Sequence, residues 1–149
     1  MDRNTVITDT ARRTLRYEPF TVRKTDRPIS RLGQWPCQLD MLPDSAPYLD
    51  GADLLIAADC TAFAYGDFHD RFIKGRITVI GCPRHDALAY REKLAAILRE
   101  NSIRSLEIVR MEVGCCDGIE SAVKSAIKHS GKDVPLEVTT ITTDGKIID

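Results

Sequence analysis

Between residues 53 and 141, short apolar runs of strand length alternate with longer segments that have the periodicity of amphipathic helices. The runs predict strands at residues 53–58, 76–81, 105–113 and 136–141. Strands that alternate with helices form right-handed βαβ units, in which the strands are parallel and helices cover both faces of the sheet. This alternation limits the chain to an α/β fold. We expect a single three-layer domain with a four- to five-stranded, mostly parallel sheet.

Helices are expected in the intervals between these strands. Residues 86–101 and 117–130 carry apolar side chains every three to four positions, which makes one face of each helix apolar. Gly131 is a suitable residue to end the second helix. A shorter helix is predicted at 67–73, and an Asp-Gly pair at 144–145 predicts a turn.

The pattern before residue 53 is less regular. A short strand is predicted at 38–42, ended by Pro43. A short helical turn through Leu49 is predicted next, capped by Asp44 or Ser45 and closed by Gly51. Residues 5–8 are a weaker candidate for a first strand.

Basic residues are concentrated at the start of the chain. Of its 21 Lys and Arg, eight lie in residues 1–31, against four of its 22 Asp and Glu. We therefore expect an N-terminal arm at 1–31 and an α/β domain at 32–149. A basic arm can dock on an acidic surface of the same chain or of a partner, and a solvated tail would have the same composition. The net charge of −1 gives no overall attraction to nucleic acid or membrane.

The first thirty residues contain no apolar run of the kind found in secretory signals, and no stretch approaches the roughly 20 apolar residues of a membrane span. We expect a cytoplasmic protein. In that compartment five cysteines indicate metal binding or redox chemistry rather than structural disulfides.

Four of the five cysteines directly follow predicted strands. Cys60 and Cys82 follow the first two strands, and Cys115 and Cys116 follow the third. The carboxyl ends of parallel strands share one edge of the sheet, where ligands bind in open α/β folds. We therefore expect these four thiols to meet at that edge. A structural cysteine more often replaces a small apolar residue inside a helix or strand.

Four thiolates suit a tetrahedral zinc ion or an iron–sulfur cluster. Structural zinc sites usually draw ligands in close pairs such as C-x2-C, whereas these ligands come from three loops. The side chains of the adjacent Cys115 and Cys116 diverge, which hinders binding to one ion but suits two corners of a cubane. We therefore favour a [4Fe–4S] cluster, with zinc as the alternative. Gly114 and Gly118 leave room for a bulky inorganic group beside the pair.

A resemblance supports this interpretation. The chain contains the segments QWPCQL (34–39), PYLDGADLLIAADCTAFAYGDFHDRFIKG (47–75), ITVIGCP (77–83), MEVGCCDG (111–118) and SGKDVPLEVTTITTDGKI (130–147). Together they resemble an uncharacterised family of iron–sulfur ferredoxin-like proteins of anaerobic microorganisms. Members usually carry an N-terminal ferredoxin module, which this chain lacks. Members often have Val at the position of Cys37, which leaves Cys37 outside the expected site.

The ligand set has a second likeness. A tandem Cys-Cys, a lone Cys and a Gly-Cys-Pro are similar to the ligands of the terminal [4Fe–4S] cluster in the small subunit of respiratory complex I and related hydrogenases. The order of the ligands differs here, so the likeness concerns the chemistry of the site.

Other polar residues lie close to the cysteines in sequence. His69 and His85 follow cysteine loops, where either can serve as a proton carrier or a hydrogen-bond donor to a cluster, although an exposed loop histidine is the simpler interpretation. Asp59 and Asp117 flank expected ligands, where a carboxylate can take up a proton or lower the potential.

Three functions are compatible with this pattern. The first is a one-cluster protein that transfers electrons to or from a partner oxidoreductase. The second is an enzyme that acts on a small sulfur or nitrogen compound at an open cluster or at the thiols. The third is a structural zinc module for protein interactions. A redox partner protein is expected, a homo-oligomer is compatible with the sequence, and nucleic acid and membrane are not expected as partners.

Overall fold

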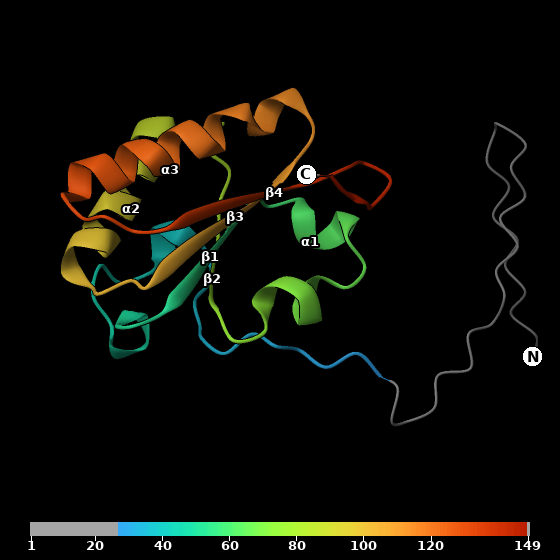
Figure 1. Cartoon of the computed structure of the whole chain (residues 1–149), viewed down its shortest axis with the longest axis horizontal. Coiled ribbons are helices and arrows are strands. Elements are labelled where there is room, and N and C mark those ends of the chain that lie inside the picture. Colours follow the sequence, from blue (N-terminus) through green and yellow to red (C-terminus); the bar gives the residue numbers. More distant parts are fainter. Residues whose placement is uncertain (1–26, 149) are drawn as a thin grey trace, which may run out of the picture.

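A five-stranded sheet forms the centre of the computed structural model, which describes residues 27–148 (Figure 1). The strand order is β2-β1-β3-β4-β5. The first four strands along the chain are parallel and β5 is antiparallel to β4. This confirms the predicted α/β class and the mostly parallel sheet. The strands are Asp53–Ala57 (β1), Ile77–Ile80 (β2), Ser105–Met111 (β3), Leu136–Ile141 (β4) and Ile147–Ile148 (β5).

Two long helices, α2 (Ala87–Glu100) and α3 (Asp117–Ser130), pack against each other on one face of the sheet (Figure 1). The carboxylate of Asp86 accepts a hydrogen bond of 2.9 Å from the Ala89 amide and caps the start of α2. Gly131 ends α3 in the left-handed conformation, with φ of 71°. Both predicted helices are therefore confirmed.

The opposite face carries a thinner layer. It consists of the single turn α1 (Thr61–Ala64) and the π-helical segment η3 (His69–Ile73), which connect β1 to β2. The chain moves one way across the sheet from β1 to β2, and the other way from β2 to β3 and from β3 to β4. Because all three crossovers are right-handed, the β1–β2 connection lies on the face opposite to α2 and α3. The rings of Phe68 and Phe72 in this layer pack with their centroids 5.1 Å apart. The predicted three layers are present.

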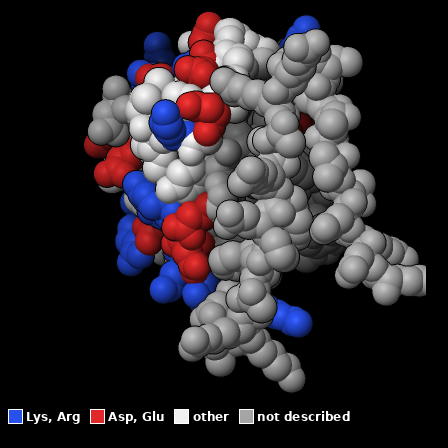
Figure 2. Space-filling model, turned by 90° about the vertical axis from the view of Figure 1, so that its right-hand side faces the viewer, with Lys and Arg blue, Asp and Glu red and all other residues white. Residues whose placement is uncertain are grey.

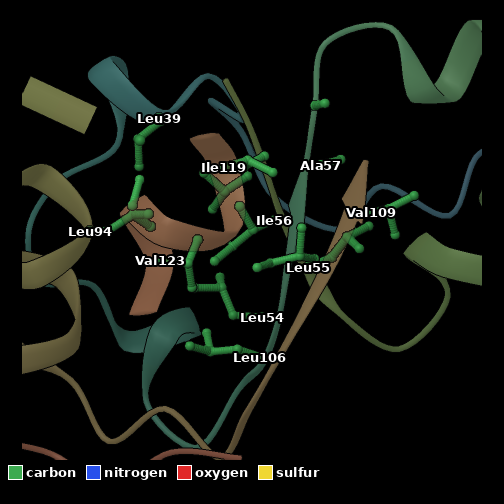
Figure 3. Close-up of a cluster of buried hydrophobic side chains, with 14 of the residues drawn as sticks. Leu39, Leu54, Leu55, Ile56, Ala57, Leu94, Leu106, Val109, Ile119 and Val123 are labelled. Carbon is green, nitrogen blue, oxygen red and sulfur yellow. The ribbon is translucent and has the colours of Figure 1, made fainter. Parts of the chain in front are cut away.

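The main core lies between the sheet and the two long helices. Figure 3 shows Leu54 and Ile56 of β1 beside Ile119 and Val123 of α3. All four side chains are at most 1% exposed. The strands are apolar on consecutive positions because both of their faces are covered.

One charged pair is buried against the thinner layer. Glu107 of β3 is only 6% exposed, and its Oε2 lies 2.8 Å from a guanidinium nitrogen of Arg76. The hydroxyl of Thr139 donates a hydrogen bond of 3.1 Å to Oε1 of the same carboxylate. Arg76 also donates to the carbonyl of Phe72 at 2.8 Å. These contacts satisfy a charge that would otherwise be costly to bury.

The predicted strand at 38–42 is wrong. A 3-10 turn, η1 (Leu39–Met41), occupies most of this segment, and only Gln38 forms a β-bridge, to Ile80. The physical reason is the spacing of the buried side chains. Leu39 and Leu42 are 1% and 2% exposed and lie three positions apart, which matches a helical turn rather than the alternation of a strand.

The remaining predictions concern shorter elements. The helical turn through Leu49 is present as η2 (Pro47–Leu49), but its N-cap is Ala46, so the predicted cap at Asp44 or Ser45 is wrong. The predicted helix at 67–73 is present as η3. The turn at 144–145 leads into β5. The candidate strand at 5–8 lies outside the described residues, and the boundary between arm and domain stays a prediction. Among residues 27–148, no helix is long and apolar enough to cross a membrane.

Candidate metal centre at the carboxyl edge of the sheet

Three cysteine loops leave neighbouring strands at the same edge of the sheet. Cys60 follows β1, Cys82 follows β2, and Cys115 and Cys116 lie in η4 (Gly114–Cys116) after β3. Because β1 is hydrogen-bonded between β2 and β3, the Cys60 loop starts between the other two loops.

Backbone hydrogen bonds join β1 to both of its neighbours shortly before the cysteine loops. The Gly81 amide donates to the Ala57 carbonyl at 3.2 Å, which ties the end of β2 to the end of β1. The Ala58 amide donates to the Val109 carbonyl at 2.9 Å, which ties β1 to β3. The three loops therefore start from one continuous piece of sheet, and their separation is fixed by the spacing of the strands.

Local turns set the direction of each loop. Both the amide and the hydroxyl of Thr61 donate to the Ala58 carbonyl, at 3.1 and 2.7 Å, and this tight turn carries Cys60. The Cys116 amide donates to the Val113 carbonyl at 3.0 Å and closes the turn that carries the adjacent pair.

The four thiols differ in exposure. Cys116 is 5% exposed, Cys82 is half-buried, and Cys60 and Cys115 are exposed. Burial raises the pKa of the Cys116 thiol, and negative charge on Cys115 and Cys82 raises it further. A backbone hydrogen bond of Met111 and the positive charge of Arg110 act in the opposite direction. Cys82 and Cys115 thus lie within electrostatic reach of Cys116, and the loop of Cys60 starts from the strand between theirs.

The thiols do not form a preformed site for a single ion. Within the described part of the chain, no three His, Cys, Asp or Glu side chains surround one point closely enough to hold a metal ion. Four thiolates on one zinc, each at about 2.3 Å, would lie only about 4 Å from one another. A cubane instead takes each ligand at a separate corner, so it tolerates ligands from separate loops.

The surroundings of the adjacent pair fit a negatively charged inorganic group. A Cβ atom built on Gly118 would meet nothing within 4 Å, and one on Gly114 would meet only the Asp117 carboxylate at 3.8 Å, so there is open space beside both glycines. No side chain caps the start of α3 at Cys116. The Cys116 and Asp117 amides at this point already donate to the carbonyls of Val113 and Gly114, so the partial positive charge of the helix start, rather than unpaired amides, faces the site.

Arg110 adds a positive charge at this position. Its guanidinium lies 2.6 Å from the carboxylate of Asp117, and its side chain is only 15% exposed. The predicted flanking carboxylate at Asp117 is thus paired with a cation.

Tyr90 belongs to this edge and was not predicted as a site residue. It is 5% exposed, and its hydroxyl is buried without a hydrogen-bond partner in the described structure. Burial raises its pKa, and negative charge on Asp59, Cys82 and Cys116 adds to the effect. Tyr90 lies on the apolar face that is predicted for the helix at 86–101, and this face of α2 is buried. Its position one turn into the helix that follows Cys82 was the available signal for a role at the site.

A hollow of about 230 Å³ lies beside Cys82. Its buried wall includes Tyr90, Gly81 and Leu39, and its rim is acidic and exposed. The lining residues are Gln38, Leu39, Asp40, Asp59, Gly81, Cys82, His85, Asp86, Ala89 and Tyr90.

The remaining candidates have different positions. His85 lines this hollow, whereas the ring of His69 accepts a hydrogen bond of 3.0 Å from the Arg31 amide. The Cys37 carbonyl accepts a hydrogen bond of 2.9 Å from the Ile80 amide, so its backbone lies beside the end of β2.

A second hollow, of about 370 Å³, lies at the opposite edge of the sheet. Its three arginines, Arg31, Arg76 and Arg104, are each paired with a carboxylate. The hydroxyl of Tyr48 at this hollow is also buried without a partner in the described residues. On the face seen in Figure 2, the acidic and basic side chains of the described residues are interspersed.

Two comparisons with known proteins give a match. A family model described as a Rossmann-like domain matches residues 46–149, a range that includes all three cysteine loops. A protein of Archaeoglobus fulgidus, described as uncharacterized, is 32% identical over 120 residues, which cover 80% of this chain and 84% of the relative. No solved structure gives a significant match.

Proposed function

The chain belongs to the Rossmann-like domain family, and we propose that it binds one [4Fe–4S] cluster through Cys60, Cys82, Cys115 and Cys116. In this role the protein transfers electrons to or from a partner oxidoreductase. The observation that carries this proposal is the placement of the four thiols in the loops that follow three hydrogen-bonded neighbouring strands. This is the edge at which open α/β sheets bind their ligands. The resemblance to the iron–sulfur family of anaerobes points in the same direction.

The donor set favours a cluster over zinc. Thiolates are the usual ligands of iron–sulfur clusters, and ligands from three loops reach separate corners more easily than one ion. The cluster would supply a one-electron carrier. The chain would supply four thiolates as ligands, and the start of α3 and the positive charge of Arg110 would stabilise negative charge on sulfur.

A partner can approach this edge directly. Cys60 and Cys115 are exposed, and the side chain of Phe63, three residues after Cys60, is 93% exposed. An apolar side chain next to a redox centre suits the small interfaces of transient electron-transfer complexes. We therefore expect the partner to contact α1 and η4.

The test is anaerobic purification followed by visible and electron paramagnetic resonance (EPR) spectroscopy, with each of the four cysteines replaced by serine in turn. We expect the wild-type protein to be brown and to bleach on reduction. Each of the four variants should contain less cluster per chain than wild type. Cys37→Ser is the matched control and should retain full occupancy. A colourless protein, or equal occupancy in all five variants, would contradict the proposal.

The enzymatic alternative has one observation in its favour, which is the hollow beside Cys82. It would be supported if replacing one of the four cysteines left the cluster bound, because that cysteine would then mark an open coordination position. Cys60, which is exposed, is the first to examine.

A further inference from the structure

The hydroxyl of Tyr90 is the strongest unexplained feature of the described structure. It is inaccessible to solvent and has no hydrogen-bond partner within residues 27–148. Native proteins leave few buried hydroxyls unpaired, because an unpaired buried polar group costs free energy. Each such group therefore calls for a partner.

The position of Tyr90 limits what that partner can be. The ring packs against Gly81, the residue before Cys82, so closely that a Cβ atom built on Gly81 would lie 2.9 Å from the ring carbon Cε2. Tyr90 and Cys82 also line the same hollow. The ionisable groups around it fall into two sets. Asp59, Cys82 and Cys116 carry negative charge that acts on Tyr90, and Asp40, His85 and Asp86 line the same hollow.

Of these neighbours, the cysteines suit a buried hydroxyl best. The other groups, Asp40, Asp59, His85 and Asp86, are exposed and can be solvated by water. A thiolate in a metal centre carries negative charge and is stabilised by hydrogen bonds from the surrounding protein. The hydroxyl can give a hydrogen bond to such a sulfur without losing its proton.

We propose that Tyr90 is a positioning residue that donates a hydrogen bond from its hydroxyl to the Cys82 thiolate of the bound cluster and thereby raises the reduction potential of the cluster. This inference rests on the proposed function. Reduction adds one negative charge to the cluster, so a hydrogen bond to its sulfur is stronger in the reduced state. Removing the hydroxyl should make reduction less favourable.

The experiment is a redox titration of anaerobically purified wild-type protein and Tyr90→Phe, with iron content measured for each. Phe keeps the ring and its packing against Gly81 and removes only the hydroxyl. We expect unchanged iron content and a lower midpoint potential, by up to about 59 mV, which is a tenfold change in the ratio of reduced to oxidised cluster for one electron.

Tyr48→Phe is the matched control. Its hydroxyl is also buried without a partner in the described residues, but it lies at the hollow on the opposite edge of the sheet. A general effect of losing a buried hydroxyl would shift both variants, whereas a hydrogen bond to the cluster would shift Tyr90→Phe alone.

A spectroscopic measurement covers the case in which the shift is small. Electron–nuclear double resonance of the reduced wild-type cluster in heavy water should lose the signal of an exchangeable proton coupled to the cluster, and Tyr90→Phe should lack that signal already in ordinary water. Equal potentials and equal proton signals in wild type and Tyr90→Phe would overturn the inference. A protein without iron would overturn the proposed function instead, so the two failures are distinguishable.

Discussion

Replacing Gly145 by alanine should destabilise the fold through a contact between the carboxyl-terminal hairpin and the Cys60 loop. Gly145 lies in the turn between β4 and β5 with φ of +85°. A Cβ atom at this position would lie 2.7 Å from the carbonyl oxygen of Ala64, the last residue of α1. The hairpin therefore packs directly against the single helical turn that begins after Cys60.

The magnitude follows from two separate costs. A left-handed backbone costs an L-amino acid about 1–2 kcal/mol relative to glycine. Overpacking against a backbone atom that cannot rotate away costs about 1–3 kcal/mol. Together they give a loss of about 2–5 kcal/mol in the free energy of unfolding, a large part of the roughly 5–15 kcal/mol that stabilises a typical domain.

Urea unfolding followed by circular dichroism measures this loss. Gly66→Ala is the matched control, since Gly66 lies two residues beyond Ala64 and a Cβ atom there would meet nothing within 4 Å. The control should stay within about 1 kcal/mol of wild type. If Gly145→Ala also unfolded within about 1 kcal/mol of wild type, the hairpin would not press on α1 as the structure indicates.

Three further changes have defined outcomes. Hydrogen bonds from Arg104 and, to a lesser extent, Ser105 lower the pKa of Asp53 to about 2. The stability that this carboxylate contributes is therefore complete above its usual pKa and is lost as the pH falls through about 2. Between pH 5 and pH 2, wild type should therefore lose more free energy of unfolding than Asp53→Asn, and equal losses would refute this linkage. Arg76→Leu leaves the Glu107 carboxylate buried and unpaired and should cost about 3–5 kcal/mol in urea unfolding, whereas the double change to Leu at both positions should recover most of that loss. Asp86→Ala removes the cap of α2 and should cost about 1 kcal/mol, measured as a lower melting temperature; an unchanged value would show that the cap is dispensable.

The strands were predictable because of where they lie in the sheet. Leu54, Leu55 and Ile56 are buried on consecutive positions, and only a strand covered on both faces gives so short a continuous apolar run. The prediction for the segment with Leu39 and Leu42 was wrong because the segment is too short for the spacing of its apolar residues to distinguish a strand from a turn. The single turn α1 was missed for the same reason, as four residues carry no periodicity.

The candidate site was predictable only at the level of the sheet edge. Parallel strands bring their carboxyl ends to one edge of the sheet regardless of the side chains in the loops. The loops of Cys60, Cys82 and Cys116 could therefore be placed from the order of helices and strands alone. The unpaired hydroxyl of Tyr90 could not be predicted, because it depends on how α2 packs against the end of β2. Gly145 is a similar case. Its turn is evident in the sequence, but its contact with Ala64 crosses about eighty residues of chain.

The iron, sulfide and zinc content of anaerobically purified full-length protein tests the central claim most directly. A single [4Fe–4S] cluster predicts about four iron and four acid-labile sulfide per chain, with no stoichiometric zinc. One zinc per chain without iron or sulfide would contradict the cluster and identify the four thiols as a structural zinc site.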